Sequence, residues 1–246
     1  MDRQEFSAGF DTLVDSYRRF KNFDDRQLLD SVEFNEYEKS VFLTKAQEEL
    51  VLSLYNGKNI YGESFEQTEE QRRYLSQLVL DVLLEPISNT YGSPLGLDSK
   101  SKFFTLPDDL WFITYEAAKV NRDDDCDNMK TLDVIPVTQD KYHRTKRNPF
   151  RGANGKRALR LDLSDGVIEI ISKYDVTGYY LRYLKKPTPI ILDDLPDGLS
   201  IEGISTALGC NLHRALHQRI LEDAVRLALN SKGISAREEQ RNNNNQ

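Results

Sequence analysis

The sequence is poor in the residues that build metal sites and disulfide frameworks, with two cysteines, three histidines and one tryptophan among its 246 residues. Cys126 and Cys210 stand far apart, and neither belongs to a Cys-x-x-Cys pair. A disulfide framework and a structural zinc site are therefore both unexpected. No run approaches the roughly 20 apolar residues of a membrane helix, and the polar start lacks the apolar stretch of a secretory signal. We expect a soluble protein of a reducing cytoplasm, with no membrane contact and no cofactor.

Motifs for catalysis are also missing. Gly152–Arg157 has the glycines and the lysine of a phosphate loop but not their spacing, which favours a plain turn between strands. His213 and His217 lie four residues apart, but Arg214 stands where a zinc protease has glutamate, so helix surface or interface is the favoured interpretation. The acidic run Asp123–Asp127 lacks the glycine and the bidentate glutamate of a calcium loop and indicates a solvated loop. We expect no enzyme activity.

Charge is present in abundance, and it is unevenly distributed. The net charge is −7, yet residues 141–160 contain eight lysines or arginines and no acid. Without that segment, 25 basic and 40 acidic residues remain, a net charge of −15. Such a segment favours an anionic partner, which could be nucleic acid, a phosphorylated ligand or the acidic face of another protein molecule.

The first 85 residues show helical periodicity and carry 18 acids against 10 bases. Apolar residues recur at three- and four-residue steps over 6–20 and 34–55, and the second run ends at Asn56-Gly57, a typical helix stop. A third helix is predicted from Thr68, where Thr68–Gln71 has the form of a capping box, up to Pro86. This region is the acidic half of the chain.

From about residue 100 the hydrophobic period changes to two, which predicts strands. Asp165-Gly166 is a tight-turn signal that predicts a hairpin. The prolines and glycine between Pro187 and Gly198 predict a rigid, extended connection, and a last amphipathic helix follows over 212–231. The predicted strands are 102–106, 110–115, 132–137, 158–163, 167–172 and 178–185.

Helices first, strands together and a returning helix predict an α+β fold. We expect the N-terminal helices and the C-terminal helix to form a bundle into which an antiparallel β domain is inserted. The expected limits are 1–86 and 205–233 for the helical region, 87–204 for the β domain with a basic loop at 141–160, and 234–246 for a flexible polar tail.

The basic segment is the candidate functional site. A basic loop can be merely a solubilising surface, but Phe150, between a proline and an arginine, suits an anchored contact because aromatic and arginine residues dominate interface energetics. Its arginines can bind carboxylates in bidentate fashion, or phosphates if they face DNA. Trp111 is expected in the core rather than as a platform for stacking bases. The candidate interface residues are Arg144, Lys146, Arg147, Phe150, Arg151, Lys156, Arg157 and Arg160.

Three stretches carry a resemblance to a known family. They are Phe34–Gly57; Phe104–Tyr115 continuing through Val134–His143 to Asn148–Gly152; and Leu195–Gly203 followed by Cys210–His213 and the last helix. Together they resemble the head–tail connector, or ring, proteins of crAss-like tailed bacteriophages. More broadly, the chain is similar to the adaptor proteins beneath the portal of short-tailed phages, over roughly residues 5–232.

The resemblance implies a virion protein at the head–tail junction, assembled in the cytoplasm of the bacterial host. It implies a ring, commonly of twelve subunits, that contacts the portal protein and neighbouring tail ring proteins, seals the head and lines the channel through which genomic DNA passes without specific binding. An acidic half and a basic segment on one subunit can meet between neighbours related by rotation, which is a contact that closes into a ring.

The alternative is a non-enzymatic accessory protein that binds nucleic acid through residues 141–160. Its affinity for DNA would fall steeply with salt as phosphates are neutralised. The charge of −15 outside the segment argues against it, because that charge repels a duplex at any broad contact.

Overall fold

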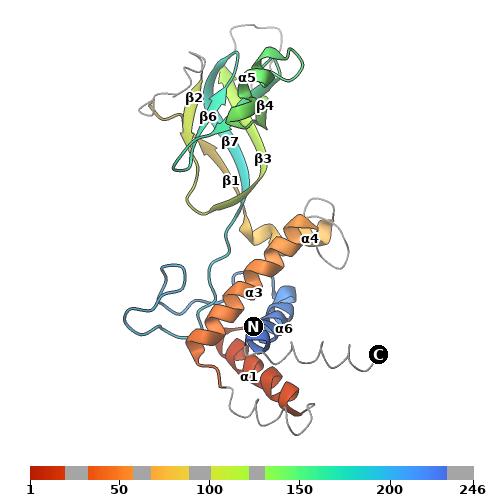
Figure 1. The fold of residues 1–246 in the computed structure, drawn as a ribbon, viewed down its shortest axis with the longest axis vertical. Helices are drawn as coiled ribbons and strands as arrows, with labels where there is room; N and C mark the ends of the chain where they lie inside the picture. The colour runs from red at the N-terminus through yellow and green to blue at the C-terminus, as the bar shows by residue number, and fades with distance from the viewer. Residues whose placement is uncertain (20–32, 58–67, 89–100, 122–130, 232–246) are drawn as a thin grey trace. The chain divides into compact units, whose positions relative to one another are not determined.

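The computed structural model describes residues 1–19, 33–57, 68–88, 101–121 and 131–231. Within these ranges the chain forms five α-helices and seven β-strands, so the α+β class is confirmed (Figure 1). The acidic run Asp123–Asp127 and the C-terminal residues 234–246 lie outside the described residues. In the described part, no helix has the length and apolar character needed to cross a membrane.

Two compact units make up the chain. Unit 1 comprises Met1–Leu78 and Pro187–Gln246, and unit 2 comprises Val79–Lys186. The chain thus leaves unit 1 after residue 78 and returns to it at residue 187, whereas the sequence patterns placed these limits at 86/87 and 204/205.

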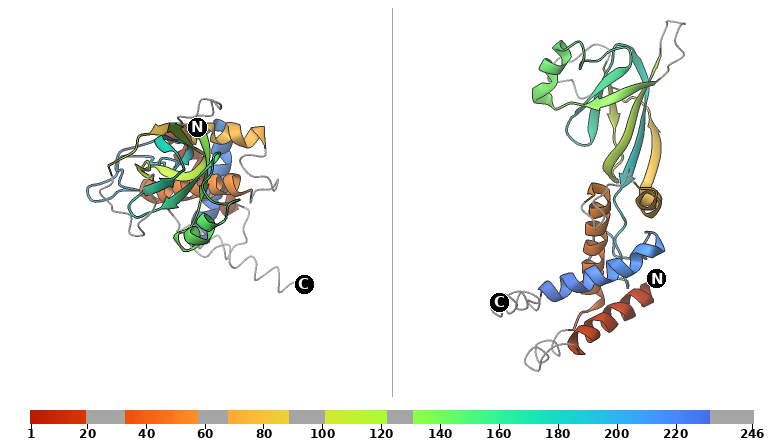
Figure 2. Two further views of the ribbon diagram at one scale, coloured as in Figure 1. Left: turned by 90° about the horizontal axis from the view of Figure 1, so that it is seen from above. Right: turned by 90° about the vertical axis from the view of Figure 1, so that its right-hand side faces the viewer.

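Unit 1 contains four helices, α1 (Arg3–Arg19), α3 (Glu36–Asn56), α4 (Glu69–Leu75) and α6 (His217–Ser231). Helix α6 packs against α1 and α3, and its side-by-side position with α1 is visible in two views (Figures 1 and 2). The predicted apolar stripes supply the buried side chains, since burying one face is what stabilises an amphipathic helix. Buried members of these stripes include Phe6, Phe10, Val14, Ala46, Val51, Leu54, Ile220, Ala224 and Ala228.

Capping interactions fix where helix α3 begins and ends. The Asn35 side chain accepts a hydrogen bond from the Glu38 N–H (2.8 Å), and the Glu38 carboxylate accepts one from the Asn35 N–H (3.0 Å). This reciprocal pair satisfies two backbone donors that the first helical turn leaves open. At the other end Gly57 has φ 70°, a left-handed conformation that suits glycine. The predicted stop at Asn56-Gly57 is confirmed.

The predicted third helix is only partly correct. Thr68 caps α4 as expected, with its hydroxyl accepting from the Gln71 N–H (3.4 Å), but the helix ends at Leu75. Residues Val79–Leu84 form strand β1 instead of continuing the helix. The spacing of apolar residues in this short segment fits both a helix and a strand. Pairing with β7 favours the strand, because it provides backbone hydrogen bonds and lets Val82 pack against the core of the sheet.

A row of side-chain hydrogen bonds attaches the returning chain to α3. Backbone groups of residues 188, 190 and 192 face three buried polar residues of α3, while Ile191 forms a β-bridge with Leu208. Backbone groups excluded from water need such partners. We call this row the polar ladder. Its bonds join Ser40 Oγ to the Leu192 N–H (3.0 Å), Thr44 Oγ1 to the Ile190 N–H (3.1 Å) and carbonyl (3.3 Å), and Gln47 Nε2 to the Thr188 carbonyl (2.8 Å).

Unit 2 is one curled seven-stranded sheet with the strand order β1-β7-β3-β4-β5-β6-β2. Its two edges approach each other, because Ile87 after β1 forms a bridge with Phe103 of β2. All six predicted strands are present, and β1 is the one that the sequence patterns missed. The remaining strands are β2 (Lys102–Thr105), β3 (Leu110–Asn121), β4 (Thr131–Pro136), β5 (Arg157–Asp162), β6 (Val167–Ile171) and β7 (Asp175–Lys185).

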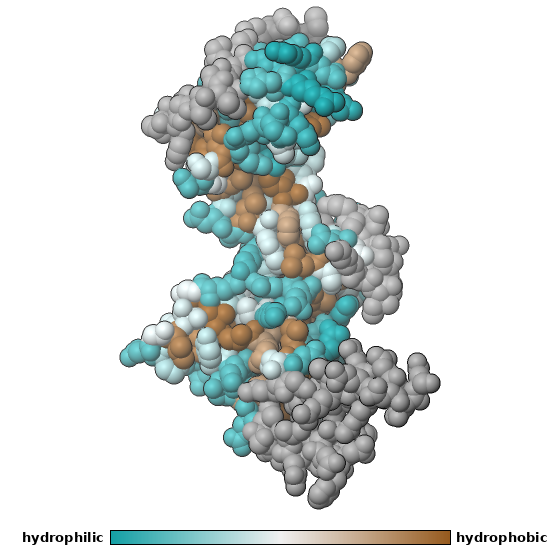
Figure 3. Space-filling model, viewed as in Figure 1, coloured by the Kyte–Doolittle hydropathy of each residue, from teal (hydrophilic) through white to brown (hydrophobic). Residues whose placement is uncertain are grey.

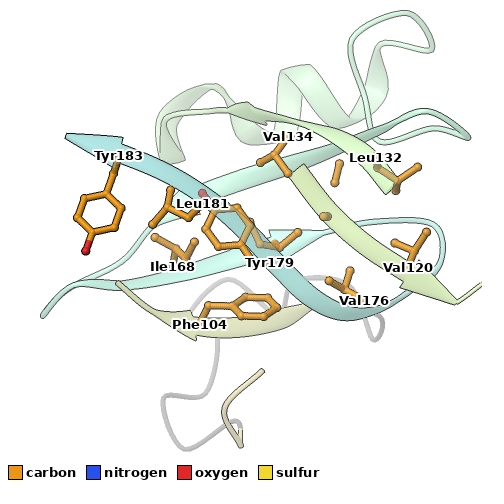
Figure 4. Packing of buried hydrophobic residues seen from close by; sticks show 12 residues of the cluster. Phe104, Val120, Leu132, Val134, Ile168, Val176, Tyr179, Leu181 and Tyr183 are labelled. Atoms are coloured by element: carbon orange, nitrogen blue, oxygen red, sulfur yellow. The ribbon is translucent and has the colours of Figure 1, made fainter. Parts of the chain in front are cut away.

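The inside of the curled sheet is the core of unit 2 (Figure 4). Buried side chains from six strands fill it. Tyr179 on β7, which lies between β1 and β3, is fully buried against Phe104, with 5.6 Å between the ring centroids. The hairpin between β5 and β6 is confirmed at Asp165-Gly166, where both residues have positive φ (57° and 69°). That backbone twist matches the twist of the paired strands.

The expectation of a purely antiparallel β domain is wrong. Strands β4 and β5 are parallel, in register from Asp133↔Arg157 to Pro136↔Arg160. Two parallel neighbours need a long crossover, usually a helix, and here helix α5 (Gln139–Arg147) supplies it. The predicted basic loop at 141–160 is therefore also wrong, because most of the segment is helix α5 and strand β5 with a turn between them.

The polar ladder generates a stability prediction. Thr44→Val keeps the shape of the side chain but leaves the buried N–H and carbonyl of Ile190 without their partner, so we expect a loss of about 2 kcal/mol in the free energy of unfolding. Thr12→Val is the matched control, since the Thr12 hydroxyl bonds the Ala8 carbonyl on the exposed face of α1 and its loss should cost under about 0.5 kcal/mol. Urea unfolding of the unaltered protein and the two variants measures both changes in the free energy of unfolding. Equal changes for Thr44→Val and Thr12→Val would contradict the role of the ladder.

Candidate functional site

Helix α5 is the base of the basic surface, and one side chain fixes it to the sheet. Tyr142 is the buried residue of the helix and packs on Leu159, Leu161 and Ile171 of strands β5 and β6. The other α5 side chains are exposed or half-buried, and Figure 3 shows hydrophilic groups covering this part of unit 2. The crossover thus presents its cationic side chains to solvent on a helix whose own position is set by an aromatic anchor.

Electrostatics along α5 follow the helix dipole. Asp140 lies in the first turn, where a hydrogen bond from the Thr138 side chain lowers the pKa of its carboxyl. Arg144, Lys146 and Arg147 occupy the last turn, where positive charge is favoured near the carbonyl end of a helix. The end of α5 therefore tolerates a concentration of cations without requiring local acidic partners.

A rigid turn after α5 presents Phe150 to solvent. The Asn148 side chain accepts a hydrogen bond from the Phe150 N–H (2.9 Å), and the Arg157 guanidinium donates to the Phe150 carbonyl (2.9 Å). Gly152 closes the turn by donating to the Asn148 carbonyl (2.8 Å), and a Cβ there would lie 3.1 Å from two carbonyl oxygens. The Phe150 side chain is 85% exposed although its backbone is fixed.

The predicted interface residues divide into three groups. Arg144, Lys146, Arg147, Phe150, Arg151 and Lys156 are exposed on α5 and the following turn. Arg157 is half-buried and holds the Phe150 carbonyl. Arg160 is buried in strand β5 and belongs to an internal network. We call the exposed group the basic surface.

A pocket of about 280 Å³ lies within the basic surface. Arg144 and Arg151 line it, together with three residues that the sequence-based list omitted: Lys141, Thr145 and Asn148. A helix over 139–147 places Lys141, Arg144 and Thr145 on one face, a spacing that the prediction of a loop did not reveal. Three cationic side chains around one depression can bind a carboxylate or a phosphate group.

Arg160 stabilises unit 2 from within. Its guanidinium contacts Glu116 of β3 at 2.8 Å and Asp162 at 3.1 Å, and the Tyr179 hydroxyl donates to the same Glu116 carboxylate at 2.6 Å. Burial alone would lower the pKa of Arg160, but the Glu116 carboxylate reverses the direction and raises it. Burial and the same carboxylate raise the pKa of Tyr179, which keeps its hydroxyl protonated as a donor.

Trp111 and one of the two histidines differ in burial from the sequence-based expectation. Trp111 is half-buried and stacks on Phe112 at 5.2 Å, so the expectation of a core position was wrong. His213 is exposed and accepts from the Ala215 N–H, whereas His217 is buried, which corrects the expected surface position. His217 Nδ1 accepts from the Met1 ammonium group (2.7 Å), and burial lowers the pKa of His217.

Candidate metal ligands do not cluster among the described residues. No group of three or more His, Cys, Asp or Glu side chains there could hold a metal ion. Gly152–Arg157 forms bends and the start of β5, so the predicted turn is present but joins helix α5 to a strand and not two strands.

The internal network gives a prediction that separates Arg160 from the basic surface. Arg160→Met leaves the Glu116 carboxylate buried without its main counter-charge, so the free energy of unfolding should fall by about 3 kcal/mol. Arg144→Met, an identical change on exposed α5, should alter it by no more than about 0.5 kcal/mol. Denaturant unfolding measures both, and a neutral Arg160→Met variant would show that the network adds no stability.

Comparison with known proteins identifies the family. The family model for phage tail ring protein 3/4 matches residues 1–240. The chain is 49% identical to "Ring protein 3" of Bacteroides phage crAss001 over 235 residues, which cover 94% of this chain and 96% of that protein. It is 30% identical to "Ring protein 4/5" of the same phage over 237 residues, covering 93% and 92% of the two chains. A match over nearly the whole chain leaves one assignment: the chain belongs to the phage tail ring protein 3/4 family.

Proposed function

We propose that the chain is a non-enzymatic structural subunit of a head–tail connector ring, a virion component that docks to the portal, seals the head and lines the channel through which DNA leaves. Membership of the ring protein family supports the ring itself. The relatives named as ring proteins match over more than nine-tenths of this chain, so their alignment includes both compact units. Partners are other copies of the chain, in a ring of twelve, the portal protein and neighbouring ring proteins.

The observation that carries the proposal is the rigid, exposed Phe150 within the basic surface. An aromatic side chain whose backbone is already ordered loses little entropy on binding, and aromatic and arginine residues supply most interface energy. The chain outside residues 141–160 carries a net charge of −15. A basic patch and an acidic remainder on every copy permit a head-to-tail contact that repeats around a closed ring.

Carboxylate partners fit the basic surface better than duplex DNA. A channel wall that releases a genome must bind it weakly, and a dense cluster of phosphate-binding arginines would hold it. Complementary charge between subunits instead sets their register and speeds their encounter. We propose that the basic surface faces neighbouring protein rather than the channel.

The helical elements of unit 1 and the chain limits belong to the same proposal. We propose that α1, α3 and α6 form a bundle and that the β unit, inserted in the chain between residues 78/79 and 186/187, is a separate domain.

Charge reversal on the basic surface tests the proposal. Arg147→Glu combined with Arg151→Glu should abolish ring formation with the portal and the neighbouring ring proteins, observed by electron microscopy, because both residues are exposed and change sign at the contact. The far-ultraviolet circular dichroism and the melting temperature should stay unchanged.

The matched control is Lys119→Glu combined with Lys185→Glu, which makes the same change in net charge on strands β3 and β7. This control should form rings. Unchanged assembly of the arginine variant, together with loss of salt-dependent binding to duplex DNA, would contradict the connector and favour the nucleic-acid-binding alternative.

A further inference from the structure

Unit 1 has an acidic projection that the ring assignment does not explain. Residues 193–207 leave the base formed by the Ile191–Leu208 bridge and return to it, and they project away from α3 in Figures 1 and 2. The segment contains four acids (Asp193, Asp194, Asp197 and Glu202) and no lysine, arginine or histidine. We call it the acidic arm. In Figure 3 it carries hydrophobic as well as hydrophilic groups.

Hydrogen bonds order the arm along its length. Its two sides are joined by the Leu195 N–H and the Ser205 carbonyl (2.8 Å), and by a reciprocal pair between Ile201 and Ile204 (2.9 and 3.0 Å). Glu202 and Gly203 both have positive φ (52° and 79°), which forms a two-residue turn of the hairpin type. The arm is therefore a preformed element and not a slack loop.

A second turn of the arm, at Pro196–Leu199, combines an acid with an exposed apolar side chain. Pro196 accepts a hydrogen bond from the Leu199 N–H (3.0 Å), and Gly198 between them has φ 89°, the left-handed conformation that this turn requires. Asp197 is exposed, and Leu199 is 41% exposed beside it. An ordered turn that presents an apolar side chain and a carboxylate is suited to inserting into a complementary surface.

We propose that the acidic arm of one copy docks on the basic surface of a second copy, with Asp197 in the pocket lined by Lys141, Arg144 and Arg151 and with Leu199 against Phe150. This inference rests on the proposed function, since it requires that copies assemble with one another. The arm is acidic and the pocket is lined by cations, so the two surfaces have opposite charge. Each also has an exposed apolar side chain, Phe150 at 85% exposure and Leu199 at 41%. A carboxylate between arginine side chains forms charge-assisted hydrogen bonds, and the apolar contact removes both side chains from water.

The two surfaces belong to different compact units, so each copy can give its arm to one neighbour and receive the arm of another. Such a contact is heterologous, and repetition by rotation closes a ring. The arm is acidic and would be repelled by DNA, so duplex binding at the pocket would leave the arm without a role. A protein carboxylate is therefore the occupant that explains both surfaces together.

A charge exchange within one full-length chain tests the docking. Asp197→Arg alone and Arg151→Asp alone should each lower the yield of rings about tenfold, because each places like charges at the contact. The chain that carries both substitutions should recover most of that yield, since every contact between copies then regains opposite charges in the exchanged order. Negative-stain electron microscopy counts the rings, and circular dichroism verifies that each chain is folded.

Cysteine pairing supplies a second measurement that does not depend on ring yield. Asp197→Cys in one tagged copy and Arg151→Cys in a differently tagged copy should form a disulfide between copies under mild oxidation, identified by mass spectrometry of the joined peptides. Lys119→Cys, exposed on strand β3, replaces Arg151→Cys in the control and should give no such product.

The outcomes distinguish failure of the docking from failure of the ring. If the unaltered chain forms rings but the charge exchange restores nothing and the cysteines do not pair, the arm is not the occupant and the ring subunit stands. If the unaltered chain forms no rings with its partners, the proposed function itself fails. Loss of duplex binding in Arg151→Asp, with rings undisturbed in Asp197→Arg, would assign the pocket to phosphate and overturn the docking.

Discussion

The polar ladder between α3 and residues 188–192 is the interaction on which the arrangement of unit 1 depends. A chain that returns from the β unit must satisfy its backbone hydrogen bonds. Ile191 does so through its bridge with Leu208, and Ser40, Thr44 and Gln47 of α3 bond the backbone groups of residues 192, 190 and 188. The ladder thereby fixes the Ile191–Leu208 bridge, from which the acidic arm projects. The direction of the arm is thus set by three side chains on one face of a single helix.

In unit 2 the corresponding constraint is the parallel pairing of β4 and β5. Because β4 and β5 run in the same direction, the chain must cross the sheet between them, and that crossover is where the basic residues lie. Tyr142 holds the crossover helix down, while Arg160 turns inward to Glu116 and leaves the exposed cations outside. Unit 1 thus carries the acidic arm and unit 2 carries the basic surface, and the proposed ring joins these two surfaces between copies.

Much of this fold follows from local sequence. The cap at Asn35, the stop at Gly57 and the turn at Asp165-Gly166 depend on neighbouring residues alone and could be predicted. Strand β1 could not, because a six-residue segment with five apolar residues fits helix and strand until β7 pairs with it. The burial of Arg160 depends on Glu116, which is distant in sequence, and could not be predicted. The parallel direction of β4 and β5 depends on pairing as well, so the crossover helix α5 and its pocket were not predicted. The family resemblance was visible in the sequence, and the whole-chain match confirms it.

The claim that the chain is a connector ring subunit is tested most directly by counting it in purified particles of the source phage. Quantitative mass spectrometry compares the number of copies of this chain with the number of copies of the portal protein. The account predicts equal numbers, because each subunit of the proposed ring of twelve would face one portal subunit. Absence of the chain from particles that package DNA normally would contradict the account.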